Sequence, residues 1–144
     1  MLLRILGSVV AALLLIQLVP FGRDHTNPPA VKEPAWDSPQ TRALAKRACF
    51  NCHSHETTWP WYSSVAPVSW LTQRDVNGGR QHLNFSLWNQ PQRHAGHVVE
   101  EIQTGDMPPW FYLPMHPEAK LTDAEKAALI AGFQKMPGFE KQPD

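Results

Sequence analysis

Apolar residues follow two different patterns along this chain. From Ile5 to Ile16 they form a nearly continuous run, whereas from residue 38 onward they recur at helical spacing among polar residues. Arg4 precedes the run, which therefore has the basic start and apolar centre of an export signal. A membrane-spanning helix needs about 20 apolar residues, and residues 1–22 barely supply them. We predict a signal anchor or transmembrane helix over residues 1–22, with a cleaved signal peptide as the alternative.

The next segment, residues 23–37, is rich in proline and lacks apolar periodicity. Pro28, Pro29 and Pro34 favour an extended backbone, so we predict a tether. Because the positive charge lies before the apolar run, we expect the amino terminus on the cytoplasmic side of a membrane and the rest of the chain on the exported side.

The first helix predicted after the tether leads into the only two cysteines of the chain. Ser38 suits the cap of a helix and Pro39 its first position. Apolar residues then recur at helical spacing over residues 41–48. This helix should present Cys49 and Cys52 at its carboxyl end.

Three further helices are predicted from residues that start or stop helices. Gly78 and Gly79 favour the end of one helix, and Gly105 favours the end of the next. Thr122 and Glu125 have the spacing of a capping box, which opens the last helix. These helices are expected over residues 68–76, 91–104 and 122–136. No convincing strand alternation occurs, so we predict an all-α domain over residues 38–144.

Charge and composition narrow the class of protein further. Lys plus Arg and Asp plus Glu number 13 each among 144 residues, so no excess of positive charge is available to attract nucleic acid. The 14 prolines and 6 tryptophans indicate stiff loops around a core filled with large rings. The balanced charge also predicts weak long-range steering toward partners.

Cys49-Phe50-Asn51-Cys52-His53 has the C-x-x-C-H spacing of covalent haem attachment. One tight turn allows the two thiols to reach the two vinyl groups of one porphyrin and places the following imidazole under the iron. We therefore predict a single haem c bound through Cys49 and Cys52, with His53 as an axial ligand.

Three other uses of the two cysteines stay open at this point. An oxidising compartment would allow a structural disulfide. A thioredoxin-like redox pair also uses C-x-x-C, although no βαβ pattern surrounds the motif here. A zinc site would need two of the seven histidines in addition, and no second pair of ligands at close spacing is obvious.

Met107 is the main candidate for the sixth ligand of the iron. It lies well downstream of His53, as expected when a separate loop closes over the other haem face. Pro108 restricts Met107 to extended geometry, which would present the thioether on a stiff arm. His and Met ligation raises the reduction potential and leaves no open position, so it favours electron transfer. Met115 and His116 are the competing candidates.

Arg80 and Asn84 are candidate donors to the haem propionates. Arginine offers a forked set of N–H groups that matches a carboxylate. A solvated or loop-bracing Arg80 is an equally plausible alternative.

Seven segments follow one another in a fixed order: Cys49-Phe50-Asn51-Cys52-His53-Ser54, Thr58-Trp59-Pro60-Trp61-Tyr62-Ser63, Ala66-Pro67-Val68-Ser69-Trp70, Gly79-Arg80, Leu83-Asn84-Phe85-Ser86, Met107-Pro108-Pro109 and His116-Pro117-Glu118-Ala119. Together they resemble the bacterial haem-binding domain family of small cytochrome c-like proteins. The resemblance covers most of the chain from about Trp36 onward. Asn77-Gly78-Gly79-Arg80 departs from the family pattern, because two glycines before the arginine suggest a looser turn.

The resemblance implies a cytochrome c-like single-haem domain that follows one transmembrane or signal segment. It implies Cys49, Cys52 and His53 as the attachment set and supports Met107 as the distal ligand. We expect one-electron transfer at the periplasmic face of a bacterial inner membrane, with a single-pass anchor. Respiratory redox proteins or other cytochromes are the expected partners, and nucleic acid is not. The alternative is a haem enzyme, or a gas or redox sensor, with a labile sixth ligand.

Overall fold

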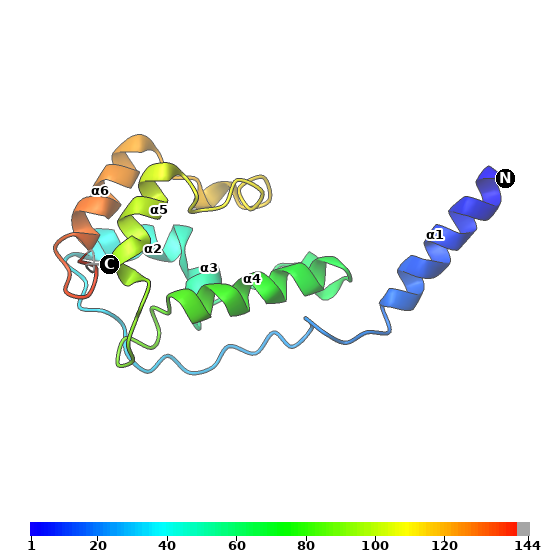
Figure 1. Cartoon of the computed structure of the whole chain (residues 1–144), viewed down its shortest axis with the longest axis horizontal. Coiled ribbons are helices and arrows are strands. Elements are labelled where there is room, and N and C mark those ends of the chain that lie inside the picture. The colour runs from blue at the N-terminus through cyan, green and yellow to red at the C-terminus, as the bar shows by residue number, and fades with distance from the viewer. Residues whose placement is uncertain (141–144) are drawn as a thin grey trace.

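The computed structural model describes residues 1–140 of the chain, and within them all the regular elements are helices joined by loops (Figure 1). Within them, the only strand-like pairing is an isolated bridge between Lys32 and Leu87. The prediction of an all-α fold is therefore confirmed. The elements in chain order are α1 (Leu2–Ile16), α2 (Pro39–Ala48), α3 (Phe50–His53), the 3₁₀ helix η1 (Trp61–Ser64), α4 (Val68–His82), the 3₁₀ helix η2 (Ala95–His97), α5 (Val98–Thr104), the 3₁₀ helix η3 (Pro117–Ala119) and α6 (Asp123–Phe133).

Helix α1 stands apart from the other helices, and none of its 15 residues is buried (Figure 1). It is shorter than the helix predicted over residues 1–22, because the chain leaves the helix at Gln17 and Pro20 cannot continue the hydrogen-bond ladder. Among the described residues, no helix combines the length and the apolar character needed to span a bilayer. The fold thus gives no support to the predicted transmembrane helix.

The helix that leads into the cysteines begins as the sequence predicts. The Ser38 hydroxyl accepts a hydrogen bond from the Thr41 amide at 3.1 Å, and Pro39 occupies the first turn. The capping box between Thr122 and Glu125 is also confirmed at the start of α6. This last helix ends at Phe133, slightly earlier than predicted.

Helix α2 packs closely against α6. A Cβ at Gly132 would lie 2.3 Å from the Thr41 hydroxyl oxygen, so only glycine allows this approach. The two helices enclose a core of aliphatic and aromatic side chains, which also takes in the loop after α4 and the chain after α6. The core contains Leu44, Ala45, Phe50, Leu83, Phe85, Ala95, Ile102, Leu121, Leu129, Phe133, Met136 and Phe139.

Two further predicted helix boundaries are wrong. Helix α4 does not end before Asn77 but continues to His82, so Gly78 and Gly79 are helical and form no turn. Helix α5 starts at Val98 and not at residue 91, although it ends at Gly105 in the left-handed conformation as predicted. Its start is delayed because Gln92 is held in a loop, where its side chain accepts from the Asn84 amide and donates to the Leu87 carbonyl.

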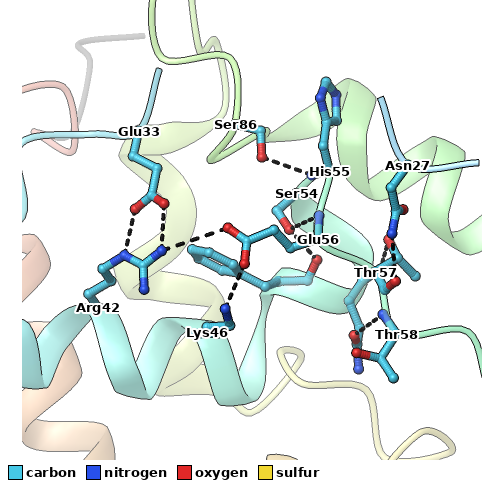
Figure 2. Close-up of polar contacts among 12 residues, drawn as sticks. Asn27, Glu33, Arg42, Lys46, Ser54, His55, Glu56, Thr57, Thr58 and Ser86 are labelled. Carbon is cyan, nitrogen blue, oxygen red and sulfur yellow. Dashed lines mark hydrogen bonds and ion pairs between the residues drawn. The ribbon is translucent and has the colours of Figure 1, made fainter. Parts of the chain in front are cut away.

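Residues 23–37 contain no helix and lie against the helical domain; we call them the N-terminal strap. The Val31 amide donates to the Ser86 carbonyl at 2.9 Å, and the Trp88 amide donates to the Lys32 carbonyl at 2.9 Å. Figure 2 shows Glu33 of the strap paired with Arg42 of α2 at 2.6 Å. The strap therefore connects α2 to the loop that follows α4.

Candidate functional site

The C-x-x-C-H motif occupies one turn at the junction of α2 and α3. Cys49 ends α2, where its amide donates to the Ala45 carbonyl at 2.8 Å. Its own carbonyl accepts from the His53 amide at 3.0 Å, which closes the turn around Cys52. Both cysteines are free thiols. The turn thus brings two thiols and one imidazole together, as covalent haem attachment requires.

Burial keeps both thiols protonated at neutral pH. It raises the pKa of Cys49 to about 12, to which the neighbouring Cys52 also contributes. Burial likewise raises the pKa of Cys52 to about 11, with a further contribution from Asp75. Redox-active cysteines of the thioredoxin type have the opposite property, a lowered pKa. The electrostatic environment therefore argues against the thioredoxin-like alternative.

The orientation of His53 is set by two backbone carbonyls of the α4 region. Its Nδ1 lies 2.9 Å from the Gly79 oxygen and 3.1 Å from the Leu83 oxygen. Because both neighbours are acceptors, Nδ1 carries the proton and donates it, which leaves the lone pair on Nε2. Burial lowers the pKa of His53 and so favours the neutral ring. A neutral imidazole whose second nitrogen donates to a carbonyl is the usual form of a metal-ligating histidine.

Gly79 allows α4 to approach the motif closely enough for this contact. A Cβ at Gly79 would lie 2.4 Å from the Cys52 carbonyl oxygen and 3.0 Å from the Cys52 Cβ. At Gly78, by contrast, an added Cβ would meet nothing within 4 Å. The second of the two glycines is therefore the one that the site requires.

Met107 lies in residues 105–116, which we call the distal loop. Its amide donates to the Glu101 carbonyl at 3.1 Å, and the residue is 36% exposed. The loop is joined to the motif by a hydrogen bond of 2.7 Å from the Asn51 amide group to the Tyr112 hydroxyl. The structure thus connects the loop that carries Met107 directly to the C-x-x-C-H turn.

The two competing ligands have different environments. His116 is nearly buried, with Nε2 bonded to the Tyr62 hydroxyl at 2.5 Å and Nδ1 to Glu118 at 3.0 Å. Its ring also stacks on Tyr112 at a centroid distance of 4.0 Å. Both nitrogens of His116 are thus engaged within the protein. Met115, in contrast, is 60% exposed.

Sequence reasoning missed Asn51, Tyr62 and Tyr112. Asn51 is one of the two variable positions of C-x-x-C-H, and its partner Tyr112 lies 61 positions away. The sequence offered a clue only for the two tyrosines: Tyr112 lies four residues before His116, and Tyr62 lies in the tryptophan-rich segment. Burial raises the pKa of Tyr112 to about 12, so its hydroxyl remains protonated.

Arg80 braces the loop after the motif. Its guanidinium donates to the Ser54 carbonyl at 2.8 Å and to the side chains of Asn27 and Thr57, each at 2.9 Å. This is the loop-bracing alternative named above. Its predicted role at a propionate is untested and stays a prediction.

Asn84 is buried in the loop that follows α4. Its side-chain oxygen accepts from the Ser86 amide at 2.9 Å, and its amide nitrogen lies 3.1 Å from His55 Nε2. Both polar atoms therefore have partners inside the domain, and its role at a propionate is likewise a prediction.

The arrangement gives no support to a zinc site. In residues 1–140, no three or more side chains of histidine, cysteine, aspartate or glutamate come together in a way that could hold a metal ion. The donor set that remains, two thiols in one turn with a carbonyl-oriented imidazole, fits a haem.

Comparison with known proteins identifies a family to which this sequence is similar. The sequence pattern of the haem-binding domain family matches residues 11–135, which is most of the chain. No curated protein and no solved structure matches it. The matched span contains the cysteines, His53, Arg80, Asn84 and Met107. The chain therefore belongs to the haem-binding domain family.

Proposed function

We propose that this protein is a c-type cytochrome, which binds one haem covalently through Cys49 and Cys52 and transfers single electrons. The observation that carries the proposal is the geometry of His53, whose Nδ1 donates to Gly79 and Leu83 and whose Nε2 is left to bind iron. A haem held in this way supplies a one-electron couple between ferrous and ferric iron. The protein supplies a fixed ligand on one face of the haem and two covalent attachments at its edge.

The attachment needs no external oxidant. Each thiol would add across one vinyl group, with sulfur bonding to one carbon and the proton ending on the other. Because Cys49 and Cys52 occupy a single turn that ends at His53, the three residues could hold one haem together. Loss of the haem would then require breaking covalent bonds.

Met107 is proposed as the ligand on the opposite face. The hydrogen bond between Asn51 and Tyr112 supports this assignment, because it holds the distal loop against the motif. The engagement of both His116 nitrogens also supports it, since a ligating His116 would have to give up Tyr62 or Glu118. With His53 and Met107 both bound, the coordination would stay constant when the iron changes charge, which suits a carrier better than an enzyme.

We further propose that residues 1–22 attach the protein to the periplasmic face of a bacterial inner membrane. The support is the exposed apolar surface of α1 and the charge of Arg4 at its amino end. Respiratory redox proteins or other cytochromes would be the partners.

The covalent haem is tested by mass. The full chain is produced with the cytochrome c maturation machinery, denatured and weighed, and its pyridine haemochrome spectrum is recorded. We expect a mass that exceeds the bare polypeptide by one haem and a spectrum of two thioether bonds. Cys52→Ala should retain a single thioether and shift the spectrum. A mass equal to that of the bare polypeptide would show that the proposal is wrong.

The sixth ligand is tested by a matched pair of variants. Met107→Ala should abolish the thioether-to-iron charge-transfer band of the ferric protein and produce a high-spin fraction, whereas Met115→Ala should leave the spectrum unchanged. Loss of the band in Met115→Ala alone would transfer the assignment to Met115. A wild-type protein that is high-spin and binds small gases would favour the haem enzyme or sensor instead.

A further inference from the structure

An apolar stripe is exposed at the amino end of α4. Val68 and Leu71 are spaced by three residues on α4. Val65 precedes the helix in an extended conformation, and its carbonyl accepts from the Ser69 amide at 2.9 Å, which ties it to the first turn of α4. The exposed fractions of Val65, Val68 and Leu71 are 43%, 39% and 55%. Trp61, in the 3₁₀ helix just before them, is 77% exposed.

The chain that leaves α1 crosses α4 beside this stripe. Gly22 has φ +77° and lies so close to α4 that a Cβ there would be 2.3 Å from the Ser69 carbonyl oxygen. Phe21, one residue earlier, is 54% exposed. Phe21 borders a surface hollow with Gln73 and Asn77, on the side of α4 that carries Ser69. We call Val65, Val68 and Leu71 the apolar patch.

Gln17 connects the end of α1 rigidly to the same region. Its side-chain amide donates to the Ala66 carbonyl at 2.8 Å, and its oxygen accepts from the Ala66 amide at 3.0 Å. The polar group that follows the apolar helix is thus satisfied by the backbone next to Val65. It needs no water at this point, which lowers the cost of placing it near hydrocarbon.

The length of α1 gives the second part of the argument. Its 15 residues extend for about 22 Å at a rise of about 1.5 Å per residue. The hydrocarbon layer of a bilayer is about 30 Å thick. An apolar segment that is too short draws its flanking residues toward the membrane. The residues that follow α1, Gln17 and Gly22, contact the backbone of Ala66 and Ser69, which are sequence neighbours of Val65 and Val68 in the patch.

We propose that the apolar patch lies in the boundary between the lipid headgroups and the acyl chains, so that the haem domain rests on the bilayer in a fixed orientation. The proposal builds on the membrane attachment proposed above and adds a second, direct contact. Trp61 beside the patch is of the residue type enriched at this depth. Arg74, exposed one turn after Leu71, suits a lipid phosphate.

The test uses photocrosslinking of the haem-loaded full chain in vesicles of phosphatidylethanolamine and phosphatidylglycerol. A benzophenone amino acid replaces, in separate proteins, Val10 of α1, Leu71 of the patch, or the exposed Ala127 of α6. Helix α6 lies at the end of the molecule opposite α1 (Figure 1). Lipid adducts are quantified by mass spectrometry of the cleaved protein. We expect adducts at Val10 and at Leu71, each several-fold above the level at Ala127.

The three positions separate the two proposals. Adducts at Val10 with only the Ala127 level at Leu71 would overturn the seating on the bilayer and leave the attachment through α1 intact. No adduct at Val10 would overturn both. Crosslinks from Leu71 to protein in place of lipid would also overturn the seating. With the benzophenone residue at Val68, the added substitution Leu71→Glu should lower the lipid adduct several-fold, because a buried carboxylate opposes contact with hydrocarbon.

Discussion

The aromatic core and the distal loop are both rich in large apolar side chains, yet they are packed in opposite ways. In the core, Phe133 and Phe139 stack at a centroid distance of 4.6 Å and Trp88 and Phe139 at 4.8 Å. In the distal loop, Trp110 is 80% exposed and Phe111 is 56% exposed. The core therefore holds the fold, whereas the loop is held mainly by single hydrogen bonds.

The two proposed iron ligands lie in these two different environments. His53 belongs to the fixed side, because it is anchored between α3 and α4. Met107 belongs to the side with few packed rings, where the Asn51–Tyr112 hydrogen bond links the loop to the motif. Substitutions in the core should therefore affect folding, whereas substitutions in the loop should affect ligation.

The largest effect is expected from truncating the core. Phe133 is fully buried, so Phe133→Ala should lower the free energy of unfolding of the haem-loaded protein by about 3–5 kcal/mol. Trp110→Ala removes a larger but exposed ring and should change it by no more than about 0.5 kcal/mol. Guanidinium denaturation followed by far-UV circular dichroism measures both. Equal losses in the two variants would contradict the contrast between core and loop.

The next-largest effect is expected at Gly79, where α4 contacts the C-x-x-C-H turn beside His53. The adjacent Gly78 is the control. Gly79→Ala forces a methyl group against the Cys52 carbonyl and should cost about 1–3 kcal/mol of unfolding free energy through overpacking. Gly78→Ala meets no atom and should instead stabilise α4 by about 0.5–1 kcal/mol, because alanine favours the helix. The same denaturation experiment measures both variants. If Gly79→Ala were as stable as Gly78→Ala, the close approach of α4 to the motif would not exist in solution.

The role of a residue could be predicted where its hydrogen-bond partner lies nearby in the sequence. The pair Gly78 and Gly79 shows where such prediction fails. Ser38 and Thr122 cap helices through bonds to residues three positions later, so their roles were visible in the sequence. Gly78 and Gly79 look like a helix stop. They are helical because α4 packs on Cys52, a contact between distant parts of the chain.

The candidate site divides in the same way. The C-x-x-C-H turn is local, so Cys49, Cys52 and His53 could be identified from their spacing alone. The carbonyls that orient His53 belong to residues 26 and 30 positions away, and the Asn51–Tyr112 bond joins residues 61 positions apart. No local pattern predicts such pairs, and they decide how the ligands are held.

A smaller effect is expected from releasing the distal loop. Tyr112→Phe removes the hydroxyl that accepts from Asn51 and should lower the free energy of unfolding by about 0.5–1.5 kcal/mol. Amide hydrogen exchange over residues 105–116 should become faster, with exchange in α6 unchanged. Phe111→Ala is the matched control, because its exposed ring makes little contribution to packing. Unchanged exchange in the loop of Tyr112→Phe would mean that this hydrogen bond does not hold it.

The smallest effect is expected in the N-terminal strap, which packs against the helical domain. Hydrogen bonds from Arg42 hold the pKa of Glu33 below its ordinary value of 4.5, against a burial that would raise it. The folded state therefore binds this proton more weakly than the unfolded state. The resulting stability is present above about pH 4.5 and is lost as the pH falls through the lowered pKa of the folded state.

Glu33→Gln removes the charge that Arg42 contacts and should lower the free energy of unfolding at pH 7 by less than about 1 kcal/mol, because solvent screens this partly exposed pair. Below pH 4.5 the variant should lose stability less steeply than the wild type, so the two curves converge. Glu100→Gln, at an exposed position in α5, should leave the curve parallel to that of the wild type. Parallel curves for Glu33→Gln as well would mean that the strap is held by its backbone hydrogen bonds to Ser86 and Trp88 and not by this ion pair.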